Sequence, residues 1–223
     1  MEMFSPIKQQ MKNAFYYVCL LAVLALAACQ TEAKEQTLPE KVAEAYGFSA
    51  LEGVEQVRYT WNVQAGERRV SRTWTWNMAE QLVTYADADT TFQYALTAEP
   101  LPEIDAAFVN DKYWALFPFQ LMWDTGYTYK VEENAESPIS GAVATKLVIV
   151  YNDSDGYTPG DAYDLYLDER FMIREWVFRK GNGSEGRAFT WEQEEQYAGL
   201  TLSTMHRNAA GERFIWLTDI EVK

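Results

Sequence analysis

Residues 54–63 read VEQVRYTWNV and residues 68–76 read RRVSRTWTW. In the first stretch apolar side chains occupy alternate positions from Val57 to Val63, and in the second Trp74 and Trp76 alternate with threonines. Alternation with period two is the pattern of a strand that has one buried face and one face in water. Because a short glycine-containing turn separates the two stretches, they predict an antiparallel hairpin with an aromatic face.

The rest of the chain repeats this pattern. Nine further segments are rich in β-branched and aromatic residues, with Gly, Asn, Asp or Pro between most of them: 82–86, 92–96, 127–133, 142–151, 161–168, 171–180, 186–195, 200–207 and 212–222. About eleven strands spaced by roughly 8–12 residues predict a mainly β fold, one sandwich or barrel. The chain also holds 8 Trp, 14 Tyr and 11 Phe, which indicates a bulky interior.

Two segments predict helices. Residues 38–47 place Pro39 at the start of a helix, Val42 and Tyr46 on one face and Gly47 at its end. Residues 103–126 form the most apolar stretch outside the N-terminal region and predict a mid-chain helical plug, which Pro118 must kink or end. The plug is either core or a mobile lid over an apolar pocket, and a plug in a half-closed barrel can itself build a pocket.

The N-terminal region has the layout of a secretory leader. From Met11, Lys12 supplies a charge, residues 15–26 are apolar, and two alanines precede Cys29. The apolar part is too short for a spanning helix, which needs about 20 residues. The expected organisation is a lipoprotein-type signal peptide at 1–28, a tether at 29–37 and a single β-rich domain at 38–223. An ordinary signal peptide with an incidental cysteine is the alternative.

The four residues Leu26 to Cys29 resemble the bacterial lipobox. That resemblance implies that the Cys29 thiol receives a diacylglyceryl group and that Cys29 becomes the N-terminus, with a further acyl chain such as palmitate. Two or more acyl chains hold a protein firmly on a membrane. Gln30 stands where an Asp would retain such a protein in the inner membrane. We therefore expect a lipid anchor at Cys29 in the outer membrane, with the domain facing the periplasm.

Charge and cysteine content exclude some partners. The whole chain has a formal net charge of −14, and removing 1–28, with two lysines and one glutamate, leaves 17 basic and 32 acidic residues. Such a surface repels phosphate backbones, so nucleic acid is not an expected partner. Cys29 is the only cysteine outside the leader, so neither a disulfide framework nor a Cys-based metal site is expected.

Two short motifs match known loops by their letters alone. Residues 153–156, DSDG, fit part of a calcium loop, but Tyr151 and Ala162 occupy positions that must supply ligands. A turn is the better interpretation, with a surface calcium site including Asp161 as the alternative. Residues 181–186 match G-x-G-x-x-G, yet a strand rather than a helix follows, which favours a hairpin turn.

Candidate catalytic groups are sparse. His206 is the only histidine, and the pattern favours a hydrogen-bonded or exposed side chain over a catalytic base. Glu192, Glu194 and Glu195 could supply the carboxylate pair of a hydrolase, but a solvated strand face explains them better. No catalytic residue, metal ligand or cofactor is therefore predicted, and we do not expect an enzyme; a carboxylate-dependent hydrolase remains a lesser alternative.

The order of elements resembles the Lol-type (LolA- and LolB-like) carriers and receptors of bacterial lipoproteins. Residues 163–168, YDLYLD, followed by 172–176, MIREW, are similar to a tyrosine-rich hairpin of that family. Residues 45–47 with 51–54 also resemble a group of uncharacterised bacterial lipoproteins. The resemblance implies an unclosed β-barrel that holds acyl chains on its concave face under helical lids. We therefore expect a mainly β fold, a strongly curved antiparallel sheet or unclosed β-barrel with an N-terminal helix and a mid-chain helical plug.

Aromatic side chains of the strands are expected to face the plug, together with Val57 and Phe214. The residues predicted to bind a ligand, or to form core, are Tyr59, Trp61, Trp74, Trp76, Trp114, Phe117, Phe119, Trp123, Trp176, Phe178 and Trp216. The leading hypothesis is non-enzymatic binding of a lipid, an acyl chain or another hydrophobic small molecule. The alternative is an acidic envelope adaptor or structural lipoprotein that binds another protein.

Overall fold

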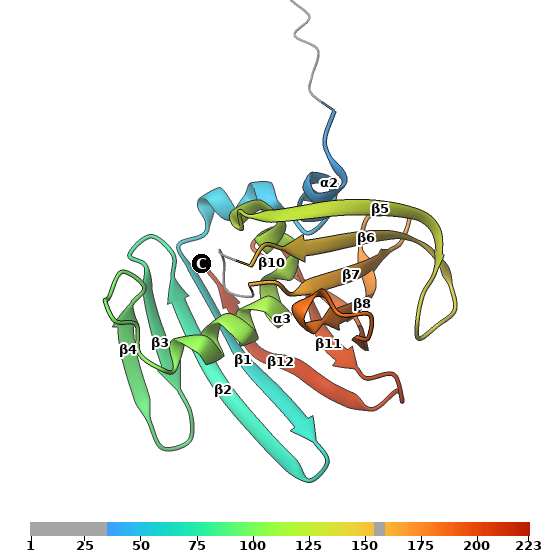
Figure 1. The fold of residues 1–223 in the computed structure, drawn as a ribbon. Coiled ribbons are helices and arrows are strands. Elements are labelled where there is room, and N and C mark those ends of the chain that lie inside the picture. Colours follow the sequence, from blue (N-terminus) through green and yellow to red (C-terminus); the bar gives the residue numbers. More distant parts are fainter. Residues whose placement is uncertain (1–34, 154–158) are drawn as a thin grey trace, which may run out of the picture. The chain divides into compact units, whose positions relative to one another are not determined.

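The computed structural model describes residues 35–153 and 159–223, and the expected signal peptide and Cys29 lie outside the described residues. Two antiparallel sheets account for most of the described chain (Figure 1). The first has the order β10-β11-β12-β1-β2-β3-β4 and the second the order β5-β6-β7-β8-β9. The twelve strands are β1 (Gln56–Ala65), β2 (Arg68–Asn77), β3 (Leu82–Ala86), β4 (Thr91–Ala95), β5 (Tyr127–Glu136), β6 (Val143–Tyr151), β7 (Ala162–Leu167), β8 (Ile173–Arg179), β9 (Arg187–Thr190), β10 (Glu192–Tyr197), β11 (Leu200–Arg207) and β12 (Arg213–Val222). The prediction of a mainly β, unclosed antiparallel architecture is confirmed.

The two sheets meet where one predicted strand is interrupted. The prediction of a single strand over 186–195 is wrong, because β9 pairs with β8 in the second sheet whereas β10 pairs with β11 in the first. At the break the Trp191 amide donates to the Arg174 carbonyl at 2.8 Å, and Gln193 has a positive φ of 57°. This change of direction lets one continuous segment belong to both sheets, as at the corner of a barrel.

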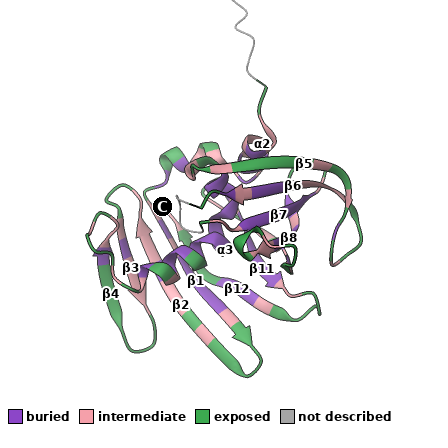
Figure 2. Ribbon diagram, viewed as in Figure 1, coloured by how far each residue is buried: buried purple, intermediate pink, exposed green. Residues whose placement is uncertain are grey.

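Strand register gathers the aromatic side chains on one face of each sheet. Tyr59 lies opposite Trp74 across β1 and β2, and Tyr163 lies opposite Phe178 across β7 and β8. Directly opposed residues of antiparallel strands project to the same face. Figure 2 shows burial concentrated along the middle strands and the long helix, while β4 and much of β5 are exposed. The core therefore lies on the inner faces of the sheets.

The first helix, α2 (Leu38–Ala45), agrees with the prediction. Thr37 and Glu40 form a reciprocal capping box at its start, with Pro39 in the first turn. Gly47 follows with a φ of 90°, and an added Cβ there would lie 2.1 Å from the Gly199 carbonyl oxygen. Only glycine fits this close approach. The short 3-10 helices η1 (Phe48–Gly53) and η2 (Lys180–Asn182) complete the helical elements of the described residues; η2 lies in the β8–β9 connection, as the predicted hairpin turn requires.

The mid-chain helix α3 (Asp105–Trp123) packs on the inner faces, and Phe108, Phe117 and Phe119 belong to the main hydrophobic cluster. Leu116 departs from helical geometry, with φ −128° and ψ 19°. Pro118 is the cause, because it has no N–H to donate and its ring clashes with the preceding turn. The predicted kink at Pro118 is thereby confirmed, and the helix serves as core as well as plug.

Candidate ligand-binding site

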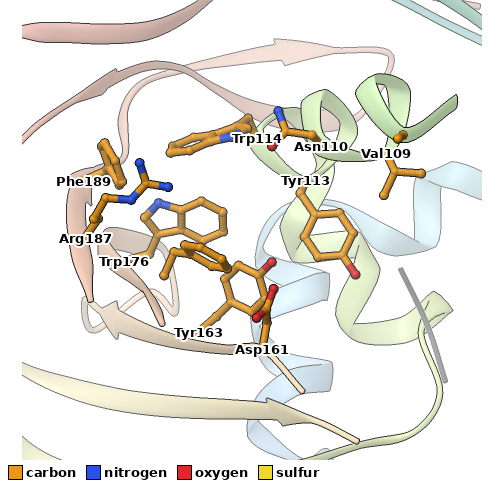
Figure 3. A pocket seen from close by; sticks show the side chains of 11 residues that line it. Val109, Asn110, Tyr113, Trp114, Asp161, Tyr163, Trp176, Arg187 and Phe189 are labelled. Atoms are coloured by element: carbon orange, nitrogen blue, oxygen red, sulfur yellow. The ribbon is translucent and has the colours of Figure 1, made fainter. Parts of the chain in front are cut away.

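A pocket of about 210 Å³ lies between α3 and the inner face of the second sheet (Figure 3). From α3 come Ala106, Val109, Asn110, Tyr113 and Trp114. From the sheet come Tyr163, Trp176, Phe178, Arg187 and Phe189, and Asp161 comes from the β6–β7 connection just before β7. A dry apolar cavity of about 150 Å³ already admits benzene, whereas pockets for drug-sized ligands occupy roughly 300–1,000 Å³. In this form the pocket accommodates a ring or a short stretch of acyl chain.

Aromatic rings form the walls of the pocket. Trp114 meets Trp176 edge-on with ring centroids 4.8 Å apart, and it meets Phe189 edge-on at 5.0 Å. Tyr163 stacks on Trp176 at 5.2 Å. These side chains converge because Tyr163 lies opposite Phe178 and Trp176 lies opposite Phe189 on adjacent strands. Apolar walls of this kind bind apolar groups by removing their surface from water.

The polar groups of the pocket stand at different places along these walls. The indole Nε1 of Trp176 is buried and has no hydrogen-bond partner. Arg187 is exposed, and its guanidinium lies 5.8 Å from the centre of the Phe178 ring. Asp161 is half-buried and accepts a hydrogen bond from the Gly181 amide at 2.7 Å. Asn110 donates to the neighbouring Asp111 at 2.9 Å.

His206 lies beneath the pocket and is fully buried. Its ring packs edge-on against Trp114 at 5.3 Å and against Trp191 at 4.8 Å, and its Nδ1 lies 3.0 Å from the Thr190 carbonyl oxygen. Burial lowers the pKa of His206 from 6.5 to about 4, although backbone contacts with Thr190 and Trp114 partly offset this. The ring is therefore neutral at pH 7 and supports Trp114 from below. It is a hydrogen-bonded histidine, as the sequence favoured.

A buried charge pair holds α3 to the first sheet. Asp111 is fully buried and accepts hydrogen bonds from Arg72 Nε and Nη2 at 2.7 Å each and from Trp74 Nε1 at 2.8 Å. Burial raises the pKa of Asp111, and the bonds from Arg72 oppose that rise. The Arg72 guanidinium also lies 4.4 Å from the centre of the Trp61 ring. Bidentate pairing of this kind fixes the orientation of the helix as well as its position.

The predicted site residues divide into three groups. Trp114, Trp176 and Phe178 line the pocket. A second group is packed into or against the core: Tyr59, Trp61, Trp74, Trp76, Phe117, Phe119 and Trp123. In that group Trp76 and Trp123 are only partly buried and meet edge-on at 5.6 Å. Most of the inner-face aromatics are thus wedged together. The aromatic pocket lies on the side of α3 that faces the second sheet, and Trp123 lines a separate groove together with Leu51 and Met78.

Trp216 forms the third group, because it lies on the opposite face from Trp61. Leu217 rather than Trp216 pairs with Trp61, so the expectation that Trp216 faces inward does not match the register. Its ring lies between two guanidinium groups, that of Arg213 at 3.9 Å and that of Arg69 at 5.1 Å. Cation–π contacts and the arginine stems cover this indole from outside.

Sequence reasoning missed several lining residues. Tyr163 and Phe189 could have been found, since each is an aromatic residue inside a predicted strand with a polar residue next to it, Asp164 or Thr190. Arg187 stands two positions before Phe189 and therefore shares its face. Nothing in the sequence indicated that Asn110 and Asp161 line this pocket, because their position depends on how α3 and the β6–β7 connection pack.

Two of the three acidic residues on β10 lie in ion pairs, and the third, Glu195, accepts a hydrogen bond from the Tyr197 hydroxyl at 2.5 Å. Glu194 pairs with Arg174, and Glu192 pairs with Arg207 at 3.4 Å. In the described lining of the pocket Asp161 is the one carboxylate. Within residues 35–153 and 159–223 there is no cluster of three His, Cys, Asp or Glu side chains that could hold a metal ion. Among the helices of that same part of the chain, none has the length and apolar character needed to cross a membrane.

Comparison with known proteins gives structural likeness only. No protein-family model matches the sequence. No curated protein matches it either. A DUF1329 family protein from Desulfovibrio piger superposes with a TM-score of 0.47 and 8% identity, covering 83% of this chain and 92% of that one. An outer membrane lipoprotein-sorting protein domain from Vibrio parahaemolyticus gives 0.44 and 10%, covering 83% and 93%.

A third solved structure, a LolA superfamily protein from Nitrosomonas europaea, gives a TM-score of 0.41 and 10% identity, covering 80% of this chain and 94% of that one. All three neighbours resemble this chain in fold alone. At such low identities and TM-scores they transfer no ligand and no residue role to this chain.

Proposed function

We propose that this chain is a lipid-anchored lipoprotein of the bacterial envelope that binds an apolar or amphiphilic ligand without transforming it. The observation that carries the proposal is the aromatic pocket of about 210 Å³ between α3 and the second sheet. A lipid, a segment of acyl chain or a hydrophobic small molecule fits the chemistry of its walls. A glycosidase-type hydrolase would need two carboxylates flanking its substrate, and the described lining supplies one, Asp161.

The anchor and the address rest on the N-terminal sequence. Acylation of Cys29 would hold the domain at the outer membrane, facing the periplasm, through a tether that ends near residue 37. Growth with an alkyne-labelled palmitate should label the full chain and leave the Cys29→Ser variant unlabelled. Label that persists in this variant would refute attachment at Cys29.

Ligand binding can be tested by filling the pocket from its mouth. Ala106 lines the pocket but is exposed, so a Trp side chain introduced there blocks the hollow without entering the packed core. Ala209→Trp in the exposed β11–β12 turn is a matched control. Native mass spectrometry of protein from bacterial membranes should find a co-purifying lipid or apolar molecule on the unmodified chain and on Ala209→Trp. It should be lost from Ala106→Trp.

Recovery of the unmodified chain with no such molecule, together with no binding of fatty-acid probes, would refute the proposal.

In a second candidate function the chain binds another protein of the envelope. Exposed apolar side chains on β5 and β6 favour it: Tyr129 is 45% exposed, Val131 37% and Val143 73%. Strand β5 is also a free edge of its sheet, where another chain can pair. In-cell crosslinking from position 143 should then give one dominant protein adduct, whereas a pure ligand carrier should give none.

A further inference from the structure

Four indole Nε1 groups of the described residues are buried without a hydrogen-bond partner, those of Trp61, Trp76, Trp176 and Trp191, and of these four residues Trp176 is the one that lines the pocket. Trp176 is 2% exposed, and its indole Nε1 has no partner. In Figure 3 this nitrogen lies on the side of the indole that faces Arg187. Buried donors are nearly always paired, because an unpaired one forfeits its hydration. A ligand with a hydrogen-bond acceptor supplies the bond that the Trp176 indole lacks in the folded chain.

Arg187 projects from the same face of the second sheet as Trp176 and belongs to the adjacent strand, β9. On β9 it lies opposite Phe178, while Phe189 lies opposite Trp176, so Arg187 is the diagonal neighbour of Trp176. Diagonal neighbours on antiparallel strands are within reach of long side chains. Arg187 contacts the Phe178 ring but forms no ion pair with a described carboxylate, although acidic residues outnumber basic ones in this chain.

The two groups share a chemical preference. An indole N–H and a guanidinium can only donate hydrogen bonds, so together they recognise an acceptor and favour a negatively charged one. Asp161 lines the same pocket and already accepts a bond from the Gly181 amide. Its negative charge disfavours an anion beside it, which leaves the Arg187 side for the charged end of a ligand.

We infer that the ligand of this pocket is an amphiphile with a carboxylate or similar anionic head, held by Arg187 and the Trp176 indole. Its apolar part then lies among Trp114, Tyr163 and Phe189. The inference rests on the proposed function and deepens it, since it assigns the class of ligand and its orientation. The apolar part that fits is short or ring-sized, as the volume of about 210 Å³ requires.

The test compares octanoate with 1-octanol, two probes with the same eight-carbon skeleton and different heads. The full-length chain carries Cys29→Ser, so that it can be purified without detergent. Octanoate should bind about tenfold more tightly than octanol, a difference of about 1.4 kcal/mol. The preference should shrink at high salt, because the Arg187 side of the pocket is open to solvent. In ¹⁵N spectra octanoate should shift the Trp176 indole N–H resonance strongly and octanol should shift it weakly.

Arg187→Gln isolates the head group, and its exposed position leaves folding undisturbed. This variant should lose the preference, so that octanoate and octanol bind with about equal affinity. Arg213→Gln is the matched control, because it removes an exposed arginine that covers Trp216, on the face of the first sheet opposite to Trp61. Equal binding of the two probes to the unmodified pocket, or a preference for octanoate that survives in Arg187→Gln, would refute the assignment of an anionic head group. Apolar binding would remain supported. If neither probe binds, the inference fails; if in addition no apolar molecule co-purifies with the unmodified chain, the proposed function fails as well.

Discussion

Lowering the pH should destabilise this protein through its one histidine. His206 is fully buried, and burial lowers its pKa from 6.5 to about 4. The unfolded chain binds a proton at His206 below pH 6.5, whereas the folded chain stays neutral there until the pH approaches 4. Stability is therefore complete above pH 6.5 and declines as the pH falls from 6.5 to 4, because the unfolded state binds more protons in that window.

The magnitude follows from the two pKa values. Each unit of difference corresponds to 1.36 kcal/mol, so moving from pH 7.5 to pH 4.5 should reduce the free energy of unfolding by about 2.5 kcal/mol through His206 alone. Carboxylates titrate in the same window, so the effect has to be isolated by a variant. His206→Phe keeps an aromatic ring against Trp114 and Trp191 and removes the titration.

Urea unfolding followed by tryptophan fluorescence gives both free energies at each pH. The unmodified chain should lose about 2.5 kcal/mol more than His206→Phe between the two pH values. Because the chain has one histidine, the imidazole proton resonances also report its pKa without assignment. Parallel losses in the two proteins, or an imidazole that titrates near pH 6.5, would refute the claim that this histidine is buried and neutral.

Three further outcomes test the packing. Asp111→Asn should reduce the free energy of unfolding by about 3 kcal/mol in urea, since it leaves the Arg72 charge without its buried partner; a loss typical of exposed carboxylates would contradict a stabilising role for the buried Asp111–Arg72 pair. Gly47→Ala should cost at least about 3 kcal/mol, whereas Gly66→Ala, also at positive φ but with open space around it, should cost about 1 kcal/mol; similar melting of the two variants would contradict the close approach. Trp216→Leu should lose about 1–2 kcal/mol of cation–π and packing energy and bind octanol unchanged, and altered binding would place Trp216 at the pocket.

Local patterns predicted the elements well. The hairpin of β1 and β2, the start and end of α2 and the kink near Pro118 all follow from neighbouring residues. Each depends on period-two alternation, on capping chemistry or on the missing N–H of proline, and these act over a few residues. Within the candidate site the same reasoning found Trp114, Trp176 and Phe178.

Tertiary structure decided how those elements share faces. Alternation separates the two sides of a strand but does not state which side is concave, and a register shift can exchange them. The β11–β12 pairing shifts register between His206 and Arg207, and β12 turns Leu217 rather than Trp216 toward the inner face. The break at Trp191, which sends β9 and β10 to different sheets, was likewise invisible in a continuous strand pattern.

The sequence by itself determined that the chain is strand-rich, aromatic and acidic, and that it has two helices at stated places. Only tertiary structure decided that most of the indoles pack against one another and that a hollow persists beside α3. It also brought Arg187 close to the Trp176 indole on neighbouring strands. The physical reason is that side-chain chemistry and periodicity are local, whereas cavities and convergent donors arise from the packing of segments distant in the chain.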